Sequence, residues 1–101
     1  MLCTNNTNYT IHYGETVNLY VSGADSTATT GTFYVSKPGS APVISKDFTL
    51  NNGTGNITLT DVETKIPLGE YIYSIVIKGI EYPSGNLPKF TVLESAKYTE
   101  V

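Results

Sequence analysis

The chain has 101 residues, a net charge of −3 and only 15% charged residues, with an isoelectric point near 4.9. This length suits one domain with a hydrophobic core of its own. The acidic balance argues against electrostatic binding to nucleic acid or to an anionic membrane surface, and we expect neither partner. No apolar stretch reaches transmembrane length and no basic segment precedes an apolar run, so we expect neither a membrane span nor a signal peptide.

The two ends of the chain lack the periodicity of its middle. Residues 1–8 are polar, which predicts a flexible N-terminal arm, and residues 95–101 are expected to form a frayed C-terminal tail. One domain is therefore predicted over residues 9–94. The single cysteine, Cys3, lies in the arm without a second cysteine for an internal disulfide, which fits synthesis in a reducing cytosol.

Short segments between these ends alternate hydrophobic and polar side chains, as β-strands with one buried face do. Turn-forming residues separate them, most clearly in the Lys-Pro-Gly-Ser-Ala-Pro stretch at 37–42 and the Asn-Asn-Gly-Thr-Gly stretch at 51–55. No amphipathic helix of useful length is present. The pattern predicts an all-β fold, an antiparallel β-sandwich of about seven strands, at residues 9–13, 16–21, 32–36, 43–50, 56–60, 71–78 and 89–93.

The alternation assigns an inward face to each predicted strand. Lys46 falls on the inward side of its strand, which indicates that residues 43–50 form an edge strand or contain a bulge. The remaining inward residues are hydrophobic and predict one core, formed by Ile11, Val17, Leu19, Val21, Phe33, Val35, Ile44, Phe48, Leu50, Ile57, Leu59, Tyr71, Tyr73, Ile75, Ile77, Phe90 and Val92.

Residues 66–78 form the most hydrophobic of these segments and predict a central strand. A turn opens it, because Pro67 fixes φ and Gly69 supplies conformational freedom. The Gly-x-Tyr-x-Tyr spacing through Tyr71 and Tyr73 resembles the tyrosine corner of immunoglobulin-like sandwiches. The resemblance implies structural roles for Gly69, Tyr71 and Tyr73. The Tyr71 hydroxyl would bond back to the preceding turn, and Tyr73 would stand where antibody domains keep their second cysteine.

Residues suited to catalysis are scarce. His12 is the only histidine, and its position in the alternation places it at the surface, without a nucleophile or carboxylate partner that the sequence identifies. The acidic residues are scattered, and the closest pair, Asp61 and Glu63, suits a polar turn before the central strand better than a calcium site. We therefore expect no enzyme activity and assign no catalytic, metal-binding or cofactor-binding residues.

The outward faces of the predicted sheets differ in polarity. One carries Thr16, Asn18, Tyr20, Thr58 and Thr60 and should meet water. The other is unusually apolar for a solvent-facing surface, and apolar surface patches mark contacts with other chains. Its predicted protein-contact residues are Tyr34, Ile72, Val76 and Leu93. Thr91 is predicted to lie on the same face. The competing interpretation is that a loop covers this face or that one strand is out of register.

Four short motifs follow one another along the chain. Residues 9–21 contain a strand, Gly-Glu-Thr and a second alternating strand. Phe-Tyr-Val at 33–35 precedes a Pro-Gly loop, Leu-Gly-Glu-Tyr-Ile-Tyr-Ser-Ile occupies 68–75, and Phe-Thr-Val at 90–92 closes the series. This order resembles the N-terminal domain of phage baseplate upper proteins and related immunoglobulin-like domains of phage tails. Baseplate upper proteins continue into a stalk, so a chain of this length suggests a small tail, baseplate or head-decoration component.

The resemblance implies a non-enzymatic structural or attachment module of a phage virion, made in the bacterial cytoplasm, with other virion proteins or further copies of itself as partners. Two alternatives stay open. The chain could be an immunoglobulin-like domain of a bacterial adhesin at the cell surface. It could also be a carbohydrate-binding module that holds a surface glycan on exposed Tyr20, Tyr34 or Tyr82, although sugar platforms favour coplanar aromatic rings and the sequence has no tryptophan.

Overall fold

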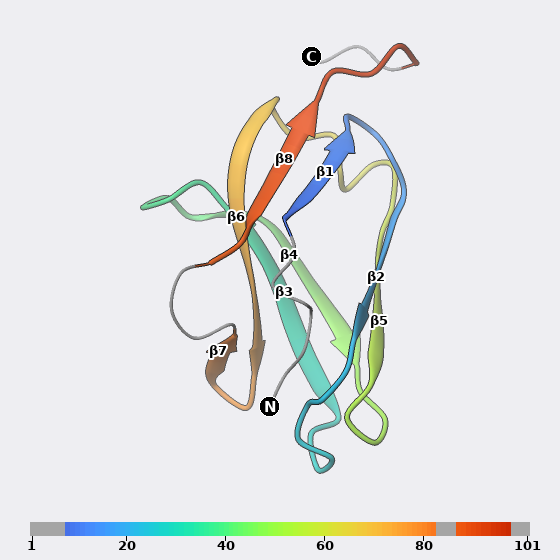
Figure 1. Ribbon diagram of the computed structural model, residues 1–101, viewed down its shortest axis with the longest axis vertical. Coiled ribbons are helices and arrows are strands. Elements are labelled where there is room, and N and C mark those ends of the chain that lie inside the picture. The colour runs from blue at the N-terminus through green and yellow to red at the C-terminus, as the bar shows by residue number, and fades with distance from the viewer. Residues whose placement is uncertain (1–7, 83–86, 98–101) are drawn as a thin grey trace.

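The computed structural model describes residues 8–82 and 87–97, and its regular structure there is entirely β (Figure 1). Cys3 and the rest of residues 1–7 lie outside the described part, as do residues 83–86 and 98–101. The strands are Tyr9–His12 (β1), Val17–Val21 (β2), Thr30–Ser36 (β3), Pro42–Thr49 (β4), Gly55–Leu59 (β5), Gly69–Ile77 (β6), Ile80–Tyr82 (β7) and Lys89–Leu93 (β8).

These strands form two sheets around one hydrophobic core. The larger sheet has the order β1-β8-β6-β3-β4, with β7 also paired to β6, and the smaller sheet is the β2–β5 pair. Figure 1 shows the larger sheet curling so that β2 and β5 lie against its concave side. Every hydrophobic residue predicted to point inward is buried, and the structure adds Tyr13, Ala28 and Ile66 to the core. The all-β prediction is therefore confirmed.

Strand β6 occupies the predicted central position. It pairs with β3 along one edge. Along the other edge it pairs with β8 in its first half and with β7 at its end. Tyr71, Tyr73, Ile75 and Ile77 on its inner face are between 1% and 3% exposed. An aromatic cluster forms around Tyr73, whose ring centroid lies 5.4 Å from that of Tyr9, 5.6 Å from that of Phe33 and 6.5 Å from that of Phe90.

Two features of the strand pairing differ from the prediction. The central strand ends at Ile77 instead of Lys78, because Lys78 and Gly79 have φ values of 52° and 76° and form a two-residue hairpin turn into β7. Two positive φ values in succession are the mark of a type I′ turn, and a lysine in the first position gives no indication of this turn in the sequence. In addition, β1 pairs with β8 in parallel, from Tyr9 opposite Phe90 to His12 opposite Leu93, so the fold is not purely antiparallel.

The predicted hydrogen bond of the tyrosine corner is present. The Tyr71 hydroxyl donates to the main-chain carbonyl of Pro67 at 2.5 Å, and Tyr71 is 1% exposed. Gly69, between them in sequence, has φ 141°. The bond fixes the turn before β6 to the base of that strand, as expected of a corner that orients the chain between the two sheets.

The Tyr71→Phe variant tests the contribution of this bond. We expect a loss of about 1 kcal/mol in the free energy of unfolding, near the middle of the range for one net hydrogen bond, because water can reach the exposed Pro67 segment and replace the hydroxyl. Denaturant titration measures the change. Tyr20→Phe is the matched control, since Tyr20 is 58% exposed and its loss should stay within about 0.5 kcal/mol. Equal losses in both variants would show that the bond contributes nothing specific.

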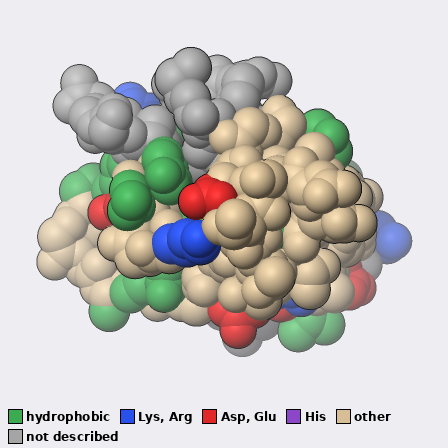
Figure 2. Space-filling view, turned by 90° about the horizontal axis from the view of Figure 1, so that it is seen from below, with side chains coloured by type: hydrophobic (Ala, Val, Ile, Leu, Met, Phe, Trp, Pro, Cys, Tyr) green, Lys and Arg blue, Asp and Glu red, His purple; other side chains and the backbone are tan. Residues whose placement is uncertain are grey.

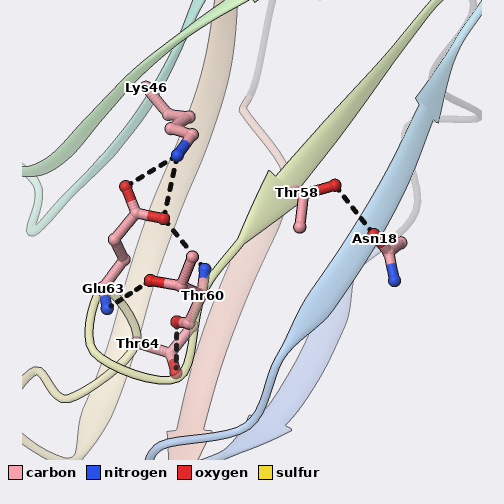
Figure 3. A network of polar contacts seen from close by, with 6 residues as sticks. All are labelled: Asn18, Lys46, Thr58, Thr60, Glu63 and Thr64. Carbon is pink, nitrogen blue, oxygen red and sulfur yellow. Dashed lines mark hydrogen bonds and ion pairs between the residues drawn. The ribbon is translucent and has the colours of Figure 1, made fainter.

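Lys46 confirms the prediction of an edge strand, because β4 is the outer strand of the larger sheet. Its ammonium group reaches across the open side between the sheets and contacts both Glu63 carboxylate oxygens at 3.0 Å (Figure 3). An inward-pointing charge of this kind protects an edge strand from pairing with another chain. The ion pair therefore closes the side of the core that β4 and the connection between β5 and β6 leave open.

A capped turn holds Glu63 in place for this ion pair. The main-chain N–H of Thr60 donates to the Glu63 carboxylate at 2.9 Å, and the Glu63 N–H donates to the Thr60 hydroxyl at 3.3 Å (Figure 3). This reciprocal arrangement is the capping box of a helix N-terminus, used here on a single turn. The next residue, Thr64, is fully buried and donates its hydroxyl to the Glu15 carbonyl at 2.7 Å, which joins this turn to the one between β1 and β2.

Glu63 should make stability depend on pH in the acid range. The hydrogen bond from the Thr60 N–H, together with the nearby Lys46 ammonium, lowers the pKa of Glu63 below its ordinary value of 4.5. A carboxyl with a lowered folded-state pKa stabilises the fold above its unfolded pKa, and this contribution disappears as the pH falls through the folded pKa. We expect Glu63→Gln to lose about 0.5 to 1 kcal/mol at pH 7 and to unfold with a smaller pH dependence below 4.5.

Urea titrations of the wild type and Glu63→Gln at several pH values measure this effect. Glu70→Gln is the control, since the Glu70 side chain is 67% exposed in its contact with Lys89. An acid dependence that stays unchanged in Glu63→Gln would contradict the assignment.

Candidate contact surface

The outward face of the larger sheet can be mapped from the strand registers. Side chains directly opposite each other on neighbouring strands form rows across this face. The first row is Glu81, Val76, Thr32 and Asp47, the second is Ser74, Tyr34 and Ser45, and the third is Lys89, Ile72 and Ser36. The first row ends in a carboxylate on both sides, whereas Val76, Tyr34 and Ile72 form an apolar group on adjacent rows.

A hollow of about 280 Å³ lies over the middle of these rows. Ser74 forms its floor, because this small side chain sits between the larger Ile72 and Val76 on the same strand. Ser74 is 3% exposed, and its hydroxyl donates to the Glu81 carboxylate at 2.6 Å. Ile72, Val76 and Tyr34 are half-buried and line the hollow, together with Leu87 from the segment before β8. The result is a hollow with largely apolar walls, two serines, Ser36 and Ser74, and one carboxylate at its side.

The structure brings three of the four predicted contact residues together. Tyr34, Ile72 and Val76 line the hollow, but Leu93 does not. Leu93 is 45% exposed and lies opposite His12 on β1. Because Gly69, the first residue of β6, already pairs with Val92, Leu93 extends past the end of β6. The apolar patch is therefore smaller than predicted.

A polar strip separates Leu93 from the hollow. Glu70 and Lys89 lie between them in an ion pair of 3.5 Å, beside the half-buried Thr91. Alternation in the sequence assigns a side chain to a face of the sheet but not to a position along that face. For this reason Leu93 was predicted to lie with Tyr34, Ile72 and Val76. Ser74, Glu81 and Leu87 were missed. Ser74 could have been found as the one small residue in the outward series of β6, whereas Glu81 required the unrecognised strand β7.

The other surfaces have fewer features that suit a contact with another protein. Figure 2 shows the molecule from below, where the centre consists mainly of backbone and of side chains that are neither hydrophobic nor charged, and hydrophobic side chains lie in separate groups. Lys78, which directly follows β6, pairs with Asp25 at 3.5 Å. The outward face of β2 and β5 is polar as predicted, with Asn18, Tyr20 and Thr58 exposed and a hydrogen bond of 2.8 Å from Thr58 to Asn18 (Figure 3).

A second hollow, of about 500 Å³, lies where the turn after β1, Asp61 and the segment 95–97 meet. His12 borders it with 63% of its side chain exposed, and its Nδ1 lies 3.5 Å from the Glu15 carboxylate, which also accepts the His12 main-chain N–H at 2.8 Å. These contacts stabilise a local turn. Within residues 8–82 and 87–97, no group of three or more His, Cys, Asp or Glu side chains is placed to bind a metal ion.

The three tyrosines considered for sugar binding do not share a surface. Tyr20 lies on the outward face of the smaller sheet, Tyr34 borders the hollow of the larger sheet, and Tyr82 packs against the core opposite Ile75. Comparison with known proteins finds no family model that matches the chain and no matching curated protein. In the described residues no helix has the length and apolar character to cross a membrane.

Proposed function

We propose that the chain is an immunoglobulin-like β-sandwich that serves as a non-enzymatic assembly or attachment module of a phage virion, in contact with another virion protein. The observation that carries this proposal is the apolar hollow over Ile72, Ser74 and Val76, which is built on the central strand of the larger sheet. A site on paired strands holds its geometry better than a site on loops, which suits a permanent contact.

Three features support the immunoglobulin-like assignment. The tyrosine hydroxyl at the entry to β6 bonds back to Pro67. Strands β2 and β5 form one sheet, while β3, β6 and β8 belong to the other. The aromatic ring of Tyr73 fills the centre of the core at the position that the tyrosine corner predicts for a cysteine. A packed aromatic cluster thus takes the place of a disulfide.

Site-specific photocrosslinking tests the proposed contact. Tyr34→p-benzoylphenylalanine places the reactive group at the hollow, and Tyr20→p-benzoylphenylalanine places it on the opposite, polar face as a control. We expect position 34, and not position 20, to crosslink to a structural protein in purified particles from the source. Absence of the chain from purified particles would contradict the virion role, and crosslinking from position 20 alone would contradict the choice of face. An adhesin domain would instead be found at the cell surface.

The Ile72→Asp variant tests whether this face matters for assembly without affecting folding. Ile72 is half-buried and directly opposite Lys89, which can neutralise the new carboxylate, so we expect the variant to stay folded. It should fail to enter particles, because the change removes the apolar surface of Ile72 from the contact and puts a hydrated carboxylate in its place, which the partner would have to desolvate. Circular dichroism reports the fold and quantitative mass spectrometry of particles reports incorporation. A variant that unfolds would show that the face is part of the core, and normal incorporation would show that the contact lies elsewhere.

A further inference from the structure

We infer that the hollow beside Glu81 receives an arginine side chain from another protein. This inference rests on the proposed function, since it names the chemistry of the partner at the same surface. The residues of the hollow offer two kinds of environment at once. Ile72, Val76 and Leu87 present apolar surface, whereas Glu81 contributes a carboxylate and Tyr34 an aromatic ring to the lining of the same hollow.

The size of the hollow is compatible with a single side chain from a partner. Sites for drug-sized ligands occupy roughly 300 to 1,000 Å³ and bury most of the ligand. At about 280 Å³, this partly open hollow lies at the lower end of that range. It suits one long side chain inserted from a partner surface, which is how an interface places its anchor residues in pockets.

The charges favour a cation at the end of that side chain. Ser74 donates to one oxygen of Glu81, and among the described residues no lysine lies within ion-pair distance of this carboxylate. The row that contains Glu81 ends at Asp47 on its other side. An arginine inserted here would pack its methylene groups on Ile72 and Val76. Its planar guanidinium group could then pair with Glu81 and lie against Tyr34, a combination that a compact ammonium group matches less well.

The same charges disfavour a second copy of the chain as the occupant. The sequence contains no arginine, and its net charge of −3 makes two copies repel. Lys46, Lys78 and Lys89 are paired with carboxylates, and Lys37 lies over the Tyr71 ring with its ammonium 5.6 Å from the ring centroid. The other two lysines, Lys65 and Lys97, also have interaction partners. A basic surface of a different protein is the complementary partner.

Nuclear magnetic resonance titration with N-acetyl-arginine amide tests the inference on the isolated chain. The neutral isostere N-acetyl-citrulline amide is the matched probe. We expect arginine to shift the amide signals of Ser74, Val76 and Glu81 with a dissociation constant on the order of 1 mM, as befits a ligand of this size. Citrulline should bind about fivefold more weakly, because it cannot form the ion pair.

Two variants locate the effect at the carboxylate. Glu81→Gln keeps an acceptor for the Ser74 hydroxyl but removes the charge, and it should weaken arginine binding about fivefold. Glu70→Gln removes the same charge from the same sheet outside the hollow and should leave binding unchanged. Equal binding of the two probes, an unchanged affinity in Glu81→Gln, or no shift at the hollow would overturn the inference. If arginine fails while position 34 still crosslinks in particles, the proposed function stands with a partner of different chemistry.

Discussion

Replacing Gly53 with alanine is expected to lower the free energy of unfolding by about 2 to 4 kcal/mol. Gly53 has φ 80° in the hairpin turn between β4 and β5, and an L-residue in this left-handed region costs roughly 1 to 2 kcal/mol. An added Cβ would also lie 2.6 Å from the main-chain carbonyl oxygen of Ala24, which cannot move aside as a flexible side chain could. The clash would disturb the 3.1 Å hydrogen bond from the Ala24 N–H to the Gly53 carbonyl.

Gly79→Ala separates the two causes. Gly79 has a nearly identical φ of 76°, but an added Cβ there meets nothing within 4 Å. Its loss should therefore be only the backbone cost of about 1 to 2 kcal/mol. Denaturant unfolding of both variants under the same conditions measures the difference. Equal losses would mean that the contact between the β4–β5 turn and the loop after β2 does not stabilise the fold.

Tyr73→Ala is expected to cost about 3 to 5 kcal/mol, the range found for removal of a large buried aromatic side chain. Tyr73 is 2% exposed and is the one ring within 7 Å of Tyr9, Phe33 and Phe90 together in the described structure. Its removal would leave a cavity at the centre of the sheet and would end all three ring contacts. Because domains are stable by only about 5 to 15 kcal/mol, this loss should be visible as a lower midpoint of thermal unfolding.

Two substitutions control for the loss of a tyrosine in general. Tyr73→Phe retains the ring and should cost less than about 1.5 kcal/mol, as volume-conserving changes do. Tyr20→Ala removes a tyrosine that is 58% exposed and should change stability by about 0.5 kcal/mol or less. If Tyr73→Ala costs no more than Tyr20→Ala, the aromatic cluster does not organise the core.

Most of the fold could be predicted because strand alternation reports directly on burial. Ile57 and Leu59, for example, stand out from their polar neighbours and are both fully buried. The parallel pairing of β1 with β8 could not be predicted, since it joins residues far apart in the sequence and alternation is the same for either direction. Strand β7 was not predicted, because it is three residues long and follows a Lys-Gly turn instead of the more typical Asn-Gly turn.

The candidate site could be predicted only in part, because alternation does not reveal the register between strands either. Tyr34, Ile72 and Val76 were recognisable as apolar residues on the outward side of their strands. Whether they lie together depends on register, which brings Ser74 opposite Tyr34 and Glu81 opposite Val76. The carboxylate that gives the hollow its chemical character belongs to the strand that the sequence did not reveal.

The parallel pairing of β1 with β8 has a mechanical consequence. The chain enters this pair at Tyr9, opposite Phe90, and leaves it at Leu93, opposite His12, so its two exits point in opposite directions. Tension applied to the chain on either side of the domain would slide the two strands past each other and load all their hydrogen bonds at once. A hairpin pulled apart from one end would instead lose its bonds one after another. The domain is thus built to resist extension between its two ends.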